Sequence, residues 1–323
     1  MILVVAAFGV VYLVWGSTYL AILFAIETIP PFLMSGTRYV VAGILLYAFT
    51  RPRTSERLTI KNWLAAGSIG CLMLLGGNGL VCWAEQSVPS GLAALMIATV
   101  PLWMVTLNWL FFKGARPTAA IILGLVLGLI GLFVLIGPGS IGGEPVDSWG
   151  AIALMSACVF WSLGSLHSRH AHLPRSTFLA TSMEMLMGGV ALLTVGVLTG
   201  EWPKLDVAAV SLKSCLALGY LIVFGAILAL TAYKWLLQVS TPARVSTYAY
   251  VNPVIAVLLG TAFAGEALTA RIFFAAAVIV TAVIIITSSA RRTKPTVVRQ
   301  TYSVCDSNDG VSQCLESAVC KQT

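Results

Sequence analysis

Two side chains of opposite charge occupy equivalent positions in a sequence that reads as one unit written twice. A shift of 146 residues places Glu184 on Arg38 and Trp161 on Trp15, and both charges fall inside long apolar runs. A charge at the centre of a membrane costs about 2.5 kcal/mol or more, so it usually faces a protein interior or a cavity. We therefore expect Arg38 and Glu184 to bind a ligand, gate a passage or carry a coupled proton. The structural alternative is that neighbouring helices or water satisfy each charge.

Other polar residues also fall inside apolar runs. Thr231, Lys234 and Gln238 share one helix face by their i, i+3 and i+7 spacing. Lys234 either lines a cavity or extends its ammonium group to the nearby membrane surface. Asn78 lies among the glycines of the segment 76–79, which allow close approach of a helix or of a ligand. Asn78 and Lys234 are therefore candidate binding residues, with helix packing as the alternative for Asn78.

Prolines recur at matching places in the two copies. A shift of 152 residues places Pro253 on Pro101, and Tyr248 and Asn252 share a helix face just before Pro253. Proline removes a helical hydrogen bond and frees the carbonyl four residues earlier, which predicts helix breaks at both prolines. Interrupted helices at matching places in two repeats often border a ligand site. Tyr248 and Asn252 are therefore candidate binding residues; the alternative is a kink without ligand contact.

Aromatic residues occupy the middle of the first apolar run and of its repeat. Trp15 and Tyr19 lie one helical turn apart, and Trp161 is the repeat mate of Trp15. Membrane tryptophans usually collect at the interfaces instead. Stacking against a flat or cationic ligand would use these rings, and core packing is the alternative.

The composition identifies the environment of these residues. The chain has 323 residues, of which 59% are hydrophobic and only 10% are charged. Soluble domains carry about 25% charged residues, so a water-soluble globule is excluded. The net charge of +7 comes from loop residues that orient a membrane protein, which argues against a nucleic-acid partner. The histidines lack a matching set of metal ligands and there is no phosphate-binding loop, so we expect no metal and no cofactor.

Ten apolar runs are long enough to cross a membrane of about 30 Å as helices. They divide into two five-helix repeats, residues 1–137 and 149–289. The polar and basic segment 290–323 is predicted to be a disordered cytoplasmic tail. The predicted spans are 2–26, 31–50, 62–84, 90–112, 118–137, 149–167, 176–199, 213–237, 243–264 and 270–289.

Loop charge predicts the orientation of the spans. If the N-terminus is cytoplasmic, 14 of the 19 Lys and Arg residues lie on the cytoplasmic side and three lie outside. Basic residues favour the cytoplasmic side, so both termini are predicted to be cytoplasmic. Because each repeat has an odd number of spans, the second must enter the membrane inverted. Inverted repeats are typical of membrane carriers with a site between the halves.

The sequence resembles the EamA-type transporters of the drug/metabolite transporter superfamily over about residues 2–289. The resemblance implies ten helices and export of small molecules from the cytoplasm without ATP. One departure is the segment Lys113–Pro117, where the family often has a Gly-Glu pair. The resemblance is carried by Trp15–Thr18, by Pro31 with Arg38 and Tyr39, by Met185–Gly189, by Pro242–Pro253 and by Gly265–Thr269.

We therefore expect a secondary transporter that exports amino acids, other metabolites or amphiphilic drugs across the plasma membrane, the inner membrane of a bacterium. An exchanger, an importer or a sensor without flux is the alternative. An enzyme is disfavoured because Glu184 is the only acidic residue well inside a span, which leaves no nucleophile–base pair. The expected partners are a small-molecule substrate and membrane lipid, with a proton on Glu184 as the coupling hypothesis. The expected assembly is a monomer or a weak homodimer.

Overall fold

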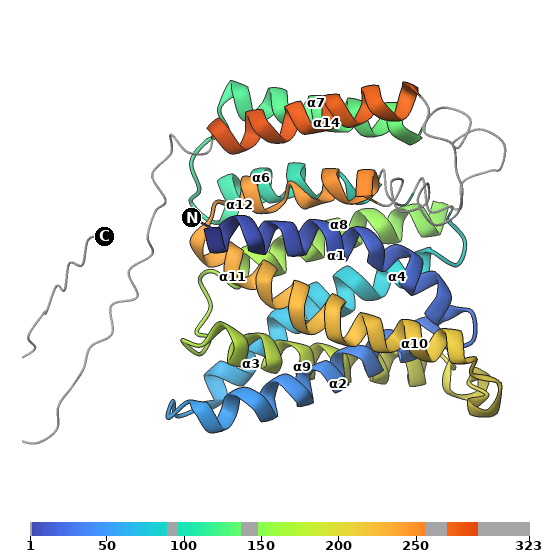
Figure 1. Ribbon diagram of the computed structural model, residues 1–323. Coiled ribbons are helices and arrows are strands. Elements are labelled where there is room, and N and C mark those ends of the chain that lie inside the picture. Colours follow the sequence, from blue (N-terminus) through green and yellow to red (C-terminus); the bar gives the residue numbers. More distant parts are fainter. Residues whose placement is uncertain (1, 89–92, 94–95, 137–147, 256–269, 290–323) are drawn as a thin grey trace, which may run out of the picture. The chain divides into compact units, whose positions relative to one another are not determined.

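The computed structural model describes residues 2–88, 93, 96–136, 148–255 and 270–289 (Figure 1). All of them belong to one compact unit that spans residues 1–293. Every regular element in this part of the chain is a helix. The predicted tail 290–323 lies outside the described residues.

Two segments, η2 and η6, are π-helical, and η1, η4 and η5 are 3-10 turns. In chain order the elements are α1 (Ile2–Ile26), α2 (Pro31–Thr50), η1 (Arg51–Arg53), α3 (Ile60–Gly70), η2 (Cys71–Gly79), α4 (Leu80–Ala84), α6 (Val100–Phe111), α7 (Ala119–Ile136), α8 (Ser148–His167), α9 (Thr177–Leu198), η4 (Trp202–Lys204), η5 (Val207–Ala209), α10 (Leu212–Tyr220), η6 (Leu221–Leu230), α11 (Thr231–Val239), α12 (Pro242–Val245) and α14 (Ala270–Ser289).

Among the described residues, six helical stretches are long and apolar enough to cross a membrane, and shorter apolar helices accompany them. The described part of the chain therefore has the helices of an integral membrane protein, as the sequence predicts. The number of ten spans and the inversion of the second repeat remain predictions. The six long stretches are Ile2–Ile26, Pro31–Arg53, Ile60–Ala84, Ser148–His167, Thr177–Leu198 and Leu212–Val239.

Helix starts follow local capping chemistry. Thr59 and Asn62 form a capping box before α3, in which Asn62 Oδ1 accepts a hydrogen bond from Thr59 N at 2.8 Å. Ser176 and Ser211 accept hydrogen bonds from the first turns of α9 and α10. Pro31 occupies the first position of α2, where its missing N–H has no intrahelical partner to lose.

Two long helices change to π geometry at corresponding places of the two repeats. Cys71–Gly79 interrupts the stretch Ile60–Ala84, and Leu221–Leu230 interrupts Leu212–Val239. π-helical segments are rare and are frequent at functional sites. The sequence analysis did not predict them, because an apolar run has the same composition in either geometry.

Helices of the first half pack mainly against helices of the second half. The α2 helix lies against α9, α7 lies beside α14, α1 contacts α10 and η6, and α8 contacts η2 and α4 (Figure 1). Small residues permit the closest of these contacts: a Cβ added at Gly36 of α2 would lie 2.7 Å from Leu193 Cγ of α9. Close packing across glycine is the usual way in which membrane helices associate.

Candidate functional site

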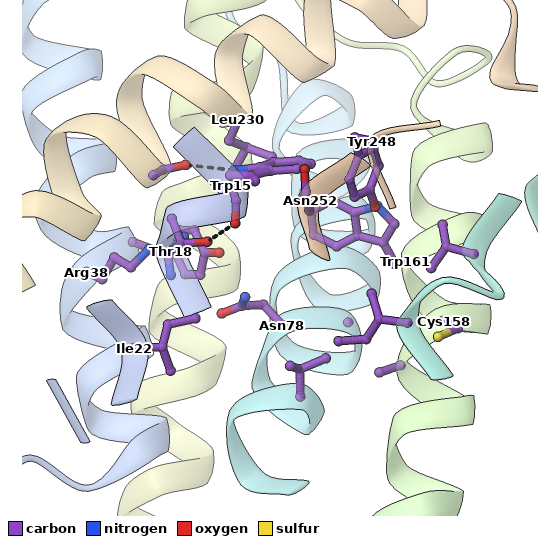
Figure 2. Close-up of a pocket in the computed structure, with 17 residues that line it drawn as sticks. Trp15, Thr18, Ile22, Arg38, Asn78, Cys158, Trp161, Leu230, Tyr248 and Asn252 are labelled. Carbon is purple, nitrogen blue, oxygen red and sulfur yellow. Dashed lines mark hydrogen bonds between the residues drawn. The ribbon is translucent and has the colours of Figure 1, made fainter. Parts of the chain in front are cut away.

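A cavity lies where both halves of the chain meet (Figure 2). The first half contributes residues from α1, α2, η2 and α6, and the second half contributes residues from α8, η6 and the segment after α12. Its volume is about 100 Å³, which is below the roughly 300–1,000 Å³ of pockets that hold drug-sized ligands. The predicted site residues that line it are Trp15, Arg38, Asn78, Trp161, Tyr248 and Asn252.

Aromatic rings form one wall of the cavity. The Trp15 ring lies 5.5 Å from that of Trp161 and 4.9 Å from that of Tyr248, both in edge-to-face geometry. The sequence did not single out Tyr233, whose ring centre lies 5.0 Å from that of Trp15. Its hydroxyl group accepts a hydrogen bond from Trp161 Nε1 and shares another with Ser165 Oγ. A buried tyrosine in an apolar run looks like core, so only the packing shows that it supports the cavity wall.

The polar atoms of these rings fix their orientation. Trp15 Nε1 donates to the carbonyl oxygen of Gly225 in η6 at 3.2 Å, and Trp161 Nε1 donates to Tyr233 Oη at 3.1 Å. The Tyr233 hydroxyl also contacts Ser165 Oγ at 2.7 Å. Hydrogen bonds and ring contacts therefore hold the rings of the cavity wall in place.

Arg38 reaches the cavity from α2. Its side chain is 3% exposed, yet Nε and Nη1 have no hydrogen-bond partner among the described residues. The nearest aromatic face is that of Tyr39, whose ring centre lies 4.7 Å from the guanidinium carbon. No carboxylate of the described chain pairs with Arg38.

Two asparagines complete the polar lining. Asn78 accepts one long hydrogen bond from Cys82 Sγ at 3.8 Å and has no shorter one within the described ranges. With its amide nitrogen turned toward the backbone, Asn252 donates to Tyr12 O at 3.2 Å and to Tyr248 O at 3.0 Å. Asn252 thus ties α1 to the segment after α12, whereas the Asn78 amide is left almost free.

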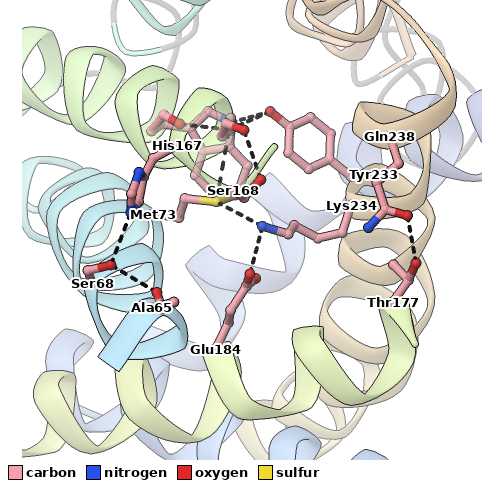
Figure 3. A network of polar contacts seen from close by, with 12 residues as sticks. Ala65, Ser68, Met73, His167, Ser168, Thr177, Glu184, Tyr233, Lys234 and Gln238 are labelled. Carbon is pink, nitrogen blue, oxygen red and sulfur yellow. Dashed lines mark hydrogen bonds and ion pairs between the residues drawn. The ribbon is translucent and has the colours of Figure 1, made fainter. Parts of the chain in front are cut away.

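Glu184 pairs with Lys234 outside the cavity lining (Figure 3). Lys234 Nζ lies 2.9 Å from Glu184 Oε1, and both side chains are 3% exposed. The ammonium also lies 3.8 Å from Met73 Sδ of η2. The interpretation that Lys234 extends to the membrane surface is wrong, because a buried carboxylate of α9 holds its ammonium group.

Two further polar contacts are considered with this ion pair, one within the second half of the chain and one between the halves. Thr177 Oγ1 at the start of α9 donates to Gln238 Oε1 near the end of α11 at 2.9 Å. Tyr12 Oη of α1 and Thr247 Oγ1 lie 2.6 Å apart. The Glu184–Lys234 pair, the Thr177–Gln238 contact and the Tyr12–Thr247 contact together are called the closing network below.

The remaining predicted site residues occupy different places. Pro101 lies in the first turn of α6, after a turn at residues 98–99. Pro253 lies within helical residues 248–255, and the interruption falls earlier, at Ser246 and Thr247. The break therefore precedes this proline instead of lying at it. The side chain of Tyr19 lies outside the described part of the structure.

Glu201 is a buried carboxylate that the sequence analysis did not single out. Its two oxygens accept hydrogen bonds from Phe32 N at 3.2 Å and Leu33 N at 2.9 Å, in the first turn of α2. A carboxylate satisfies unpaired N–H groups and the positive end of the helix dipole at such a place. The residue follows α9 in the sequence, so only the packing of α2 on α9 brings it there.

Comparison with known proteins identifies the family. The sequence profile of the EamA-like transporter family matches residues 2–137 and 148–288. The chain belongs to this family. It is therefore a membrane transporter, as its resemblance implies.

Named relatives agree with this membership. The chain is 42% identical over 259 residues to the uncharacterized inner membrane transporter YedA of Escherichia coli strain K12, covering 80% of this chain and 82% of YedA. It is 22% identical over 271 residues to the uncharacterized transporter YoaV of Bacillus subtilis strain 168, covering 81% and 89%. A crystal structure of a protein 22% identical in sequence superposes with a TM-score of 0.72 over 90% of this chain and 98% of the other, and supports the fold.

Proposed function

We propose that this EamA family member is a secondary transporter that exports small organic solutes from the cytoplasm by alternating access. The observation that carries the proposal is the cavity itself, because both halves of the chain contribute its lining. A site between two repeats can open to either side when the halves rock against each other. The inner membrane named for YedA is the proposed location.

The proposal includes ten helices arranged as two inverted repeats. The helix contacts support it: α1 packs on η6, α10 and α11, and its repeat mate α8 packs on the corresponding η2, α3 and α4. The α2–α9 and α7–α14 contacts each join an element to its own repeat mate. This exchange of partners is what a pseudo-two-fold axis between inverted halves produces.

The closing network supports a state that is shut on the cytoplasmic side. Thr177 and Gln238 lie at helix ends that the loop charges place in the cytoplasm, and Glu184 and Lys234 lie one to two turns deeper. A solute leaving the cytoplasm would enter when these contacts open and would be released outside after they close. A gradient supplies the energy in this scheme, since the sequence holds no phosphate-binding loop for ATP.

Counterflow in proteoliposomes tests the proposal. Vesicles loaded with one unlabelled amino acid or organic amine should accumulate the same labelled solute when the protein is present. Trp15→Leu and Trp161→Leu should reduce this flux at least tenfold, because they remove the aromatic wall, whereas Trp202→Leu, an exposed tryptophan, should not. Counterflow of no solute in a broad panel would reject the proposal. Higher cellular accumulation on expression would instead indicate import.

A further inference from the structure

Arg38 is a buried cation whose charge the described protein does not neutralise. The side chain is 3% exposed, and two of its three nitrogens have no partner within the described ranges. A guanidinium group cannot lose its proton in a protein, so it cannot escape the cost of burial by becoming neutral. Something that is absent from the described protein must compensate it.

None of the described carboxylates forms an ion pair with Arg38, including Glu85, whose Oε2 has no hydrogen-bond partner among the described residues. Glu184 is paired with Lys234, and both oxygens of Glu201 accept backbone hydrogen bonds from α2. Glu27 pairs with Lys213 at the surface. Arg38 therefore differs from Lys234, the other buried cation, which has a partner of its own.

The surroundings of Arg38 are those of a binding site. Arg38 lines the cavity, and Asn78 presents its side-chain amide on the side of the cavity that holds Arg38 (Figure 2). Trp161 and Tyr248 lie across from them (Figure 2). One end of the cavity thus offers a cation and an amide, and the other offers aromatic rings.

We propose that Arg38, assisted by Asn78, binds a carboxylate of the transported solute. The substrate is then a small monocarboxylic acid or zwitterion whose apolar or aromatic body packs on Trp15, Trp161 and Tyr248. A planar guanidinium matches a carboxylate through two parallel hydrogen bonds, and the cavity's apolar walls strengthen that pairing. This inference rests on the proposed transport function and narrows its substrate class.

The charge balance of the lining excludes other ligands. Arg38 is the single cationic residue among those that line the cavity in the described structure. A dianion such as a phosphate monoester would leave one negative charge uncompensated among apolar side chains, which is costly. A cationic dye would add a second positive charge beside Arg38. The volume of about 100 Å³ also favours a compact solute.

Matched pairs of acids and amides test the inference on the full-length protein in nanodiscs. The probes are phenylacetate, L-phenylalanine and L-leucine, each compared with its primary amide, and binding is read from calorimetry and from the thermal unfolding midpoint. We expect at least one acid to bind at least tenfold more tightly than its amide. Equal binding of acid and amide, or binding of no acid, would overturn the inference.

Substitutions assign the preference to Arg38. Arg38→Gln should abolish the difference between acid and amide, Arg38→Lys should keep a reduced difference, and Asn78→Ala should weaken acid binding several-fold. Arg57→Gln, which removes an exposed arginine, is the matched control. Removing an unpaired buried charge should leave the protein folded, which size-exclusion chromatography checks. A preference that survives Arg38→Gln would contradict the proposal.

Counterflow separates this inference from the proposed function. Flux of amides or amines with no preference for acids would leave the transport function standing and reject the role of Arg38. Acid binding that depends on Arg38, without counterflow of the same acid, would support the subsite and reject transport of that solute.

Discussion

At the scale of single residues, Glu184 and Lys234 each compensate the buried charge of the other. Both side chains are 3% exposed, so neither charge can be solvated if its partner is removed. Breaking a buried pair costs about 3–5 kcal/mol, whereas replacing both partners by neutral groups is often nearly neutral. Glu184→Gln or Lys234→Met alone should therefore lower the free energy of unfolding much more than the double substitution does.

A double-mutant cycle measured by denaturant titration in detergent micelles checks this expectation. The surface pair Glu27–Lys213, with side chains 46% and 49% exposed, is the matched control. Exposed pairs contribute about 0–1 kcal/mol, so Glu27→Gln should have a small effect. Additive costs at Glu184 and Lys234 would show that the two charges are not coupled.

Glu85, which follows the third long stretch directly, gives a prediction for pH. Burial raises the pKa of its carboxyl to about 7, and Oε2 has no hydrogen-bond partner among the described residues. The folded protein therefore binds a proton on Glu85 more tightly than the unfolded chain does. The protonated carboxyl contributes fully to the free energy of unfolding below the ordinary pKa of a glutamate, and this contribution is lost as the pH rises toward 7.

The substitution Glu85→Gln tests this sign. The amide cannot ionise, so the variant should melt at a higher temperature than the native protein at pH 8, and the difference should shrink at pH 5. Thermal unfolding of both proteins at the two pH values is the measurement. A gain in melting temperature of equal size at both pH values would contradict the assignment.

Residues whose type is anomalous in its surroundings are the ones that the sequence brings forward, and their binding roles stay predictions. Arg38 and Asn78 stand out because they are polar within apolar runs, and both line the cavity. Tyr233 and the pairing of Glu184 with Lys234 could not be found in this way. A buried tyrosine resembles core, and the contact of Glu184 with Lys234 depends on how α9 packs on α11, which local patterns do not encode.

At the scale of elements, carboxylates tie the repeat-related helices α2 and α9 together at both ends. Glu201, after α9, accepts hydrogen bonds from the first turn of α2. Glu56, after α2, accepts hydrogen bonds at 3.0 and 3.2 Å from the backbone nitrogen of Arg175, just before α9. Each helix is thus followed by an acidic residue that holds the start of its mate.

This arrangement predicts unequal effects of removing the two carboxylates. Glu201 is 7% exposed, and Glu201→Ala should lower the free energy of unfolding by about 0.5–2 kcal/mol, the usual cost of losing a helix cap. Glu56→Ala should cost less because its contacts are exposed to solvent. Denaturant titration and amide exchange at Leu33 are the measurements. Unchanged exchange at Leu33 in Glu201→Ala would rule out the capping role.

Helix ends are the part of the fold that the sequence predicts well. The predicted spans 2–26, 31–50 and 270–289 coincide with α1, α2 and α14, because the length of an apolar run reflects membrane thickness. The π-helical segments and the turn before Tyr248 were missed. The π-helical segments η2 and η6 contact α8 and α1 of the opposite half, and such long-range packing is not encoded in local patterns.

At the scale of the whole molecule, the closing network and the cavity should respond to each other. Both residues lie in the second half, so if the cytoplasmic side opens between α9 and α11, the contact between Thr177 and Gln238 must separate once in every transport cycle. A covalent link at this point would hold the protein in the state described here. Such a link should leave the cavity able to bind ligand, because neither residue lines it.

The double variant Thr177→Cys with Gln238→Cys tests this coupling. Thr177 Oγ1 and Gln238 Oε1 are 2.9 Å apart, but glutamine is longer than cysteine, so a short bifunctional reagent with a reducible disulfide joins the two cysteines. Cross-linking should abolish counterflow and reduction should restore it, while ligand binding measured in nanodiscs persists. Each single-cysteine variant, treated in the same way, controls for modification of the native cysteines. Full flux through completely cross-linked protein would mean that this contact does not open during transport, and the solute route would then have to bypass the start of α9.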